Sequence, residues 1–168
     1  MRPSLRYGDT LHRALDTWVK LARSFATMNH LSSDQIRGSG LTLPQFGVLE
    51  CLGHKGPLTQ GELSRKQLAS GGNMTVVVDN LERDGLVERG RSDLDRRQVR
   101  VRLTPKGEEL FQQVFLPHAE FIGECLSVLT PEEQTQLGVL LKKLGVGLSE
   151  KTPELVAGIR ATQNVARR

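Results

Sequence analysis

The sequence predicts a mainly α (α+β) protein in which a single β-hairpin interrupts a series of helices. Apolar residues recur at spacings of three and four along most of the 168-residue chain, which is the period of an amphipathic helix. Capping boxes mark three helix starts, at Thr42, Thr59 and Thr130. Residues 98–103 instead alternate between apolar and polar side chains, which is the period of a β-strand.

The first predicted helix begins at Asp9 or Thr10 and runs to about Met28. Its apolar residues form one stripe, which must pack against distant helices or against a second subunit: Leu11, Leu15, Trp18, Ala22 and Phe25. Residues 29–40 are polar and contain glycine, so they predict a loop with at most a short turn at 33–37.

Two short helices follow. The capping box at Thr42 opens a helix that ends near Gly53, and the Gly56-Pro57 pair forces a break. The box at Thr59 opens the next helix, which has an apolar inner face and a basic outer face. The sequence predicts Leu63 and Leu68 inward, and it predicts Arg65 and Lys66 outward, where they can meet phosphates.

The next helix, residues 70–84, has Ser70 as its cap and an inner face of Met74, Val77, Val78 and Leu81. Its outer faces hold Asn73, Thr75, Val76, Asp79, Asn80 and Arg83. Gly71 and Gly72 each cost about 1 kcal/mol against alanine inside a helix, so they fit a close approach to another surface, or a frayed start. Asn73 can pair with adenine, and Thr75 offers a hydroxyl and a methyl. The alternative is that both are ordinary exposed polar residues.

Residues 86–89 and 98–103 predict a β-hairpin with a charged tip. Val99, Val101 and Leu103 face one side, while Asp95 can hold the Arg97 guanidinium extended. Residues 83–106 contain eight basic and four acidic residues, and the resulting +4 equals the net charge of the whole chain. A localised positive field suits phosphate binding, although simply solvated arginines remain an alternative.

Two further helices close the chain. Thr104 caps a helix that has Pro105 in its first turn, reaches about Leu129, and is expected to kink or break at Pro117. Thr130 opens a helix with Leu137, Leu140, Leu141 and Leu144 on its apolar face. Beyond Gly145 and Gly147 the chain turns polar, with at most one short helix at 152–156.

Composition and motifs narrow the function classes. No apolar run is long enough for a membrane span, and two cysteines are too few for a disulfide scaffold, so we expect a cytoplasmic protein. No nucleophile elbow, phosphate loop or zinc-protease motif is present, so we expect neither an enzyme nor a cofactor. Cys51 and Cys125 lie on apolar stretches of helix, so we interpret them as small core residues and not as redox sensors. A redox trigger, or a metal trigger at Cys51 and His54, is the weaker alternative.

A tight helix pair followed by a basic hairpin suits a DNA duplex, and the motifs resemble the MarR family of winged helix-turn-helix transcription regulators. The run from Asn73 to Arg89 is similar to that family's recognition helix and the start of its wing. Asp95-Arg-Arg97, followed by Leu103-Thr-Pro-Lys-Gly107, is similar to its wing signature, and Leu43-Pro-Gln-Phe46 to a helix start. At Val76, many relatives carry a polar or basic residue.

The resemblance implies one MarR-like domain over residues 1–168, with a winged helix-turn-helix at 42–104, dimerisation helices at 9–33 and 105–147, and a tail at 148–168. It implies a homodimer that represses from a pseudo-palindromic operator and is released by a small aromatic or phenolic effector. The expected DNA-binding residues are Arg65, Lys66, Ser70, Gly72, Asn73, Thr75, Val76, Asn80, Arg96 and Arg97, with Asp95 as wing support. The expected dimerisation residues are Leu11, Leu15, Trp18, Phe25, Leu137 and Leu141. A sequence-tolerant architectural DNA binder is the alternative.

Overall fold

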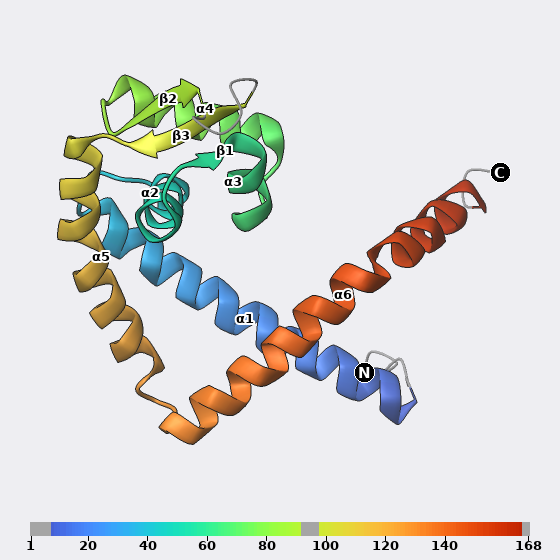
Figure 1. Ribbon diagram of the computed structural model, residues 1–168. Helices are drawn as coiled ribbons and strands as arrows, with labels where there is room; N and C mark the ends of the chain where they lie inside the picture. The colour runs from blue at the N-terminus through green and yellow to red at the C-terminus, as the bar shows by residue number, and fades with distance from the viewer. Residues whose placement is uncertain (1–7, 92–97, 166–168) are drawn as a thin grey trace. The chain divides into compact units, whose positions relative to one another are not determined.

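The computed structural model describes residues 8–91 and 98–165, and these residues form helices and one small sheet (Figure 1). The chain divides into two compact units, Met1–Ile122 and Gly123–Arg168. The elements are α1 (Asp9–Arg37), α2 (Leu43–Lys55), β1 (Leu58–Thr59), α3 (Gln60–Lys66), α4 (Gly71–Arg83), β2 (Val87–Arg91), β3 (Val99–Leu103), α5 (Pro105–Leu126) and α6 (Pro131–Val165). The predicted mainly α fold class, with a single small β-sheet, is confirmed.

The predicted capping boxes begin their helices as expected. The Thr42 hydroxyl accepts from the Gln45 backbone N–H, and the Gln45 side chain accepts from the Thr42 backbone N–H in return. The same reciprocal pair joins Thr59 and Glu62, and the two backbone hydrogen bonds recur between Thr130 and Glu133. Each box satisfies N–H groups that a helix start leaves without partners, which is why these boundaries can be located from sequence.

The sheet is antiparallel in the order β1-β3-β2. β3 lies in the centre, with Leu58 of β1 opposite Val101 and Val87 of β2 opposite Leu103. Val101 is fully buried, whereas Val99, on the same side, is exposed at the far end of the strand. The predicted hairpin is therefore confirmed, and the short β1 adds a third strand that the sequence pattern does not indicate.

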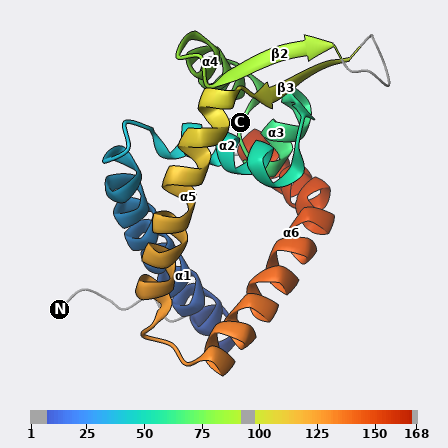
Figure 2. The same ribbon diagram turned by 60° about the vertical axis from the view of Figure 1, so that its left-hand side comes forward.

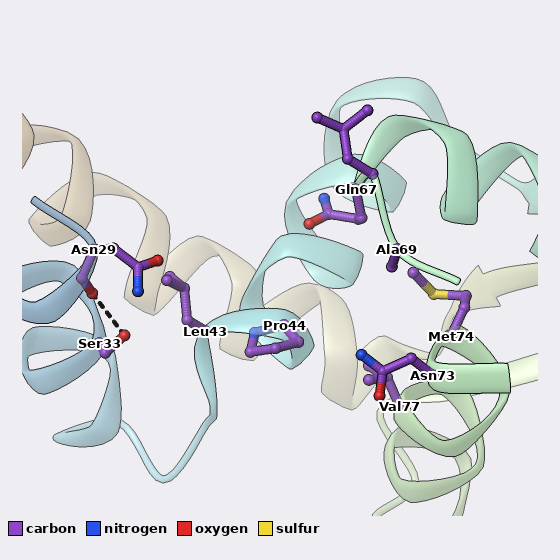
Figure 3. Close-up of a pocket in the computed structure, with 10 residues that line it drawn as sticks. Asn29, Ser33, Leu43, Pro44, Gln67, Ala69, Asn73, Met74 and Val77 are labelled. Carbon is purple, nitrogen blue, oxygen red and sulfur yellow. Dashed lines mark hydrogen bonds between the residues drawn. The ribbon is translucent and has the colours of Figure 1, made fainter. Parts of the chain in front are cut away.

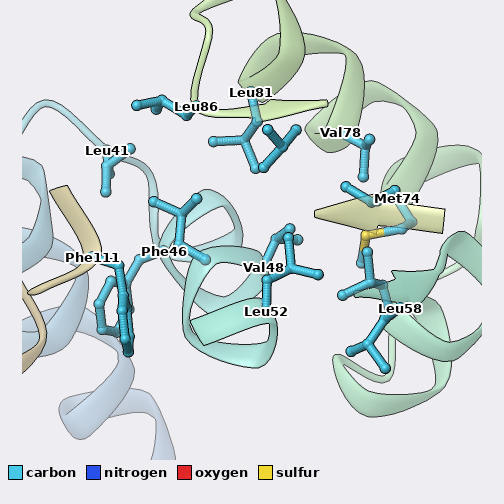
Figure 4. Packing of buried hydrophobic residues seen from close by; sticks show 14 of the residues in the cluster. Leu41, Phe46, Val48, Leu52, Leu58, Met74, Val78, Leu81, Leu86 and Phe111 are labelled. Carbon is cyan, nitrogen blue, oxygen red and sulfur yellow. The ribbon is translucent and has the colours of Figure 1, made fainter. Parts of the chain in front are cut away.

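The buried core of the first unit lies beneath this sheet and between α2, α3 and α4 (Figure 4). Phe46 of α2, Leu63 of α3 and Leu81 of α4 are completely or almost completely buried. Each side chain of this size stabilises the fold by about 1.5–3 kcal/mol when fully buried. This core fixes α3 and α4 against each other, so the outer face of α4 is held by a packed interior.

The start of α5 is bonded to the turn between α4 and β2, which we call the α4–β2 joint (residues 84–86 and 104–107). The Thr104 N–H donates to Leu86 O over 3.1 Å, and the Thr104 hydroxyl donates to Gly85 O over 2.7 Å. The Lys106 Nζ donates to Asp84 O over 2.8 Å. Figure 2 shows the first turn of α5 beside this turn. The joint therefore holds the start of β2 and the end of β3 next to the first turn of α5.

The predicted loop at residues 29–40 is wrong over most of its length, because α1 continues to Arg37. Ser32 and Ile36 are buried and extend the inner face of the helix. On the exposed side, Ser33 Oγ donates to Asn29 O, and Arg37 forms an ion pair with Asp34. Polar residues on the solvated face of a helix resemble a loop in sequence. The burial of Ser32 and Ile36 nevertheless stabilises the helix through this stretch.

The last helix also differs from expectation. The sequence predicts a tail beyond residue 147 with at most one short helix, whereas α6 continues through Gly145, Gly147 and Pro153 to Val165. At Pro117 the sequence predicts a kink or a break, and α5 continues through this residue without a break and ends at Leu126. Breaking residues lower helix stability by a limited amount, and long flanking helical stretches can absorb it. None of the described helices is long and apolar enough to cross a membrane.

His118 of α5 links three helices of the first unit and makes stability depend on pH. Its Nδ1 lies 2.9 Å from Oε1 of Gln35 in α1, and its ring meets the Phe46 ring of α2 edge-on at 4.7 Å between centroids. Burial lowers the pKa of His118, and the Glu50 carboxylate opposes this shift only partly. The fold therefore favours the neutral imidazole.

Acidification should consequently destabilise the first unit. The contribution of neutral His118 is present in full above pH 6.5, its ordinary pKa, and is lost as the pH falls from there through the lowered pKa. Urea unfolding between pH 8 and pH 5 should show this loss, and His118→Gln should flatten that part of the profile. His12→Gln, which changes an exposed histidine of α1, should keep the profile of the unsubstituted chain. Equal profiles for both variants would contradict this role of His118.

Candidate nucleic-acid interface

The turn between α3 and α4 is four residues long and is held from both sides. Ser70 caps α4, and its hydroxyl accepts from the Asn73 N–H. The Gln67 side chain donates to Gly47 O and to Cys51 Sγ of α2. These contacts set the angle at which α4 leaves the turn.

The expectation that Leu68 packs inward is wrong. Leu68 has a φ of 50° and is 94% exposed. Helix α3 ends at Lys66, so Leu68 adopts a left-handed turn conformation and its side chain points to solvent. The helical period therefore does not extend to this residue, although left-handed backbone is uncommon for a branched side chain.

The outer face of α4 carries the predicted DNA-contacting residues. Gly72, Asn73, Thr75 and Val76 are exposed, and Asn80 is half-buried. On the opposite face Met74, Val78 and Leu81 are buried, as expected, and Val77 is half-buried. A cap, a packed inner face and a solvated outer face together describe a helix that can lie in the major groove of DNA.

The hydroxyl of Thr75 is bonded within the protein. It accepts a hydrogen bond from Nε2 of Gln60, the first residue of α3, and it donates to Gly71 O over 2.9 Å. Sequence reasoning missed Gln60, because a glutamine at a helix start has no pattern of its own. The contact joins the two helices of the helix-turn-helix on their exposed side.

Arg65 and Lys66 lie in the last turn of α3, and both are exposed. Neither forms a hydrogen bond or an ion pair with another side chain in the described part of the chain. Two adjacent cations that are not held in ion pairs are suited to phosphate oxygens. They are the described cations that best fit the role predicted from sequence.

Several basic residues near the hairpin are instead used inside the protein. The Arg89 guanidinium pairs with Glu82 and Asp79 of α4, and its backbone N–H donates to Glu82 Oε1 over 3.1 Å. Burial acts to lower the pKa of Arg89, but the hydrogen bonds to the two carboxylates outweigh it and raise that pKa. Arg102 pairs with Glu88, and Arg100 Nη1 donates to Pro57 O. The local excess of positive charge therefore overstates what these described side chains offer to DNA.

The residues predicted for the hairpin tip, Asp95, Arg96 and Arg97, lie outside the described residues. The predicted dimerisation residues are described, and each of them is exposed in the single chain. Trp18 and Phe25 of α1 are 63% and 69% exposed, and Leu11 and Leu15 of the same helix are also open to solvent. Leu137 and Leu141 of α6 are exposed as well.

A cavity of about 400 Å³ lies where α1, the start of α2 and α4 meet (Figure 3). Asn29 and Ser33 line it from α1, and Leu43 and Pro44 from α2. The α3–α4 turn and α4 contribute Gln67, Leu68, Ala69, Asn73, Met74 and Val77. Its lining mixes amide, hydroxyl and apolar groups, and none of the lining side chains is charged. Asn73 belongs both to this lining and to the exposed face of α4.

The two cysteines and the metal alternative have a simple structural description. Cys51 and Cys125 are both half-buried, and Cys51 accepts the hydrogen bond from Gln67. The His54 ring meets the Phe115 ring at 4.6 Å between centroids. Within residues 8–91 and 98–165, no three His, Cys, Asp or Glu side chains come together in a way that could hold a metal ion.

Comparisons with known proteins agree with this geometry. Residues 39–98 match the model of the MarR family. The chain is 36% identical over 138 residues to the uncharacterized HTH-type transcriptional regulator YkoM of Bacillus subtilis (strain 168), covering 82% of this chain and 90% of that protein. The crystal structure of a mutant E. coli MarR in complex with operator DNA is similar with a TM-score of 0.71 and 26% identity, covering 82% and 99% of the two chains. Bordetella bronchiseptica BpsR, whose DNA binding is regulated by 6-hydroxynicotinic acid, is similar with a TM-score of 0.69 and 27% identity, covering 77% and 98%.

Proposed function

This chain belongs to the MarR family of DNA-binding transcriptional regulators, and from that premise we propose that it acts as a homodimeric repressor of a pseudo-palindromic operator. The observation that carries the proposal is the exposed face of α4 with Asn73, together with the exposed, unpaired cations Arg65 and Lys66 in the last turn of α3. In this arrangement α4 enters the major groove, and the two cations contact the phosphates that flank it. By resemblance, Arg97 of the wing tip reaches the neighbouring minor groove.

The exposed apolar residues of α1 and α6 support a dimer. Large side chains such as Trp18 and Phe25 are expensive to leave in water, and burying them between two copies would recover that cost. A two-fold dimer presents two α4 helices to two half-sites, so operator symmetry follows from protein symmetry. A dimer bound across a promoter would block transcription.

The uncharged cavity beside Asn73 supports release by a small molecule. An aromatic or phenolic ring of modest size fits its volume, and Asn29, Gln67 and Ser33 can bond to hydroxyl or carbonyl groups of such a ligand. Because Asn73 lines the cavity, an occupant would compete with DNA for the same side chain. Titration of candidate phenols into a preformed operator complex tests this, and a ligand that displaces DNA should lose potency in Ser33→Leu.

Selection from random duplexes tests the function itself. The protein should enrich one short palindrome and bind it cooperatively as a dimer in the presence of excess competitor DNA. A selection that returns no preferred sequence, with uniform binding to all duplexes, would support the architectural alternative instead.

Gly72→Ala should separate stability from DNA binding. A Cβ at Gly72 meets no atom within 4 Å, so alanine fits the free protein and should stabilise it by about 0.5–1 kcal/mol. On DNA, the added methyl group lies between the backbone of α4 and the groove. We expect operator binding to weaken by about 1 kcal/mol, roughly fivefold in Kd.

Calorimetry and operator titration measure these two effects independently. Gly123→Ala is the matched control, because its Cβ also meets no atom within 4 Å but the residue belongs to α5 and not to α4. The control should leave operator affinity unchanged. Unchanged or tighter operator binding by Gly72→Ala would show that the backbone there does not approach DNA.

The paired substitution Arg65→Ala/Lys66→Ala should weaken binding to every sequence by a similar factor. The slope of log Kd against log salt concentration should fall by about 0.9 for each phosphate contact that is lost. Titrations between 50 and 200 mM salt measure this slope. Lys151→Ala supplies the control, because this exposed lysine of α6 lies beyond the predicted dimerisation helices and its loss should keep the original slope. A loss of preference at one base, with the slope retained, would contradict phosphate binding by Arg65 and Lys66.

A further inference from the structure

The outer face of α4 carries a valine where hydrogen-bonding side chains are expected. Val76 is 58% exposed and lies two residues from both Met74 and Val78, which are buried, so its side chain points away from the core. Gly72 precedes it by one helical turn and has no side chain. The centre of the DNA-facing surface of α4 is therefore apolar.

Thr75, next to Val76, has little hydrogen-bonding capacity left for DNA. A hydroxyl carries a single proton, and that of Thr75 is donated to Gly71 O over 2.9 Å. The oxygen also accepts the hydrogen bond from Gln60 Nε2. A base acceptor such as guanine N7 or O6 therefore receives no proton from Thr75. What remains available on the exposed side is the methyl group.

The other polar groups on this face are also engaged or recessed. Asp79 pairs with Arg89, and Asn80 is half-buried. Among the described side chains of α4, Asn73 is then the main free hydrogen-bonding group near the start of the helix. Base selection beyond Asn73 must rely on shape and on apolar contact.

Within the operator-binding function proposed above, we infer that Thr75 and Val76 select thymine through its C5-methyl group. Thymine is the only unmodified base that presents a methyl group in the major groove, and small apolar side chains are its usual protein contacts. The hydrogen bonds with Gln60 and Gly71 occupy the Thr75 hydroxyl in this arrangement, so the methyl group is the part of the side chain that is left for the base. The half-site therefore contains thymine opposite Thr75 and Val76, whatever base Asn73 contacts.

Replacing thymine by uracil in the selected operator tests the inference with the unsubstituted protein. The exchange removes one methyl group and leaves base pairing intact. Each methyl group that is contacted should contribute about fourfold to Kd, the equivalent of burying one CH₂ group. One or two thymines per half-site should show this loss, and the others should show none. Uniform affinity at every uracil position would overturn the inference.

Two substitutions of Thr75 test the roles of its methyl group and its hydroxyl separately. Thr75→Val keeps the methyl group and should retain the sensitivity to uracil at its position. Thr75→Ser keeps both hydrogen bonds and should lose that sensitivity, with weaker binding to the thymine operator. Val76→Ala should lose it at a neighbouring position, while Val156→Ala, an exposed valine of α6 beyond the predicted dimerisation helices, should behave like the unsubstituted protein.

The opposite pattern, with sensitivity kept by Thr75→Ser and lost by Thr75→Val, would mean that the hydroxyl recognises the base and would overturn the inference. Failure of the operator-binding function gives a different result, because the selection would then return no operator in which to place uracil. A selected operator that lacks thymine within the half-sites would also overturn the inference while leaving the operator-binding function intact.

Discussion

Phe25→Glu should convert the protein to a monomer and lower its operator affinity by about 10²–10⁴-fold, the range over which two linked binding sites exceed one. Phe25 is 69% exposed in the single chain, so glutamate there is solvated and the monomer should fold normally. In a dimer, the same carboxylate would be buried among apolar side chains without a partner, which costs several kcal/mol. Sedimentation gives the assembly state, and titration of a complete operator gives the affinity.

Ser24→Glu is the control for Phe25→Glu, because it adds the same charge to the adjacent residue of α1, away from the apolar stripe. It should remain dimeric and bind normally. A half-site duplex adds a second check, since the monomer should bind it about as well as one half of the dimer does. A dimer that persists in Phe25→Glu would exclude this part of α1 from the interface.

Gly107→Ala should destabilise the first unit by about 3 kcal/mol, the upper part of the usual range for an overfilled contact. A Cβ at Gly107 would lie 1.9 Å from Leu86 O and 2.9 Å from Leu86 C, and both are backbone atoms that cannot rotate away. Relief requires the start of α5 to move off the turn. That movement breaks the hydrogen bonds from Thr104 to Gly85 and Leu86.

Thermal and urea unfolding should therefore show a clear loss for Gly107→Ala. Gly123→Ala, in the same helix but with open space around its Cβ, should be neutral or slightly stabilising. Since the hairpin is bonded at this turn, DNA affinity should fall along with stability. An unchanged unfolding midpoint would mean that the contact at Leu86 relaxes at negligible cost.

Features carried by neighbouring residues could be predicted from the sequence. The capping boxes at Thr42, Thr59 and Thr130 use residues three apart, and β3 shows its alternation within five residues. The end of α1 could not be predicted in this way. Ser32 and Ile36 are buried, Ile36 in the core that it shares with residues of α2, α4 and α5, and nothing in residues 29–37 themselves indicates that burial. The prediction for Leu68 was wrong because α3 ends at Lys66, so the helical period does not reach Leu68.

The candidate interface was predictable to a similar degree. The exposure of Asn73, Thr75 and Val76 follows from the helical period, which assigns the outer face once the inner one is known. How Thr75 uses its hydroxyl does not follow, since Gln60 is fifteen residues away. The charge count around the hairpin could not reveal that Arg89 is neutralised, because its carboxylate partners belong to the preceding helix.

The α4–β2 joint also makes the position of the far end of the hairpin sensitive to small rotations at its base. β2 leaves this point and β3 returns to it, so a rotation of the first turn of α5 carries both strands with it. The five residues of β2 extend roughly 16 Å at about 3.3 Å per residue. A tilt of about 10° at the joint therefore displaces the far end of β2 by about 3 Å, which is the length of a hydrogen bond. An angular change too small to disturb the core is thus enough to make or break a contact at the outer end of the hairpin.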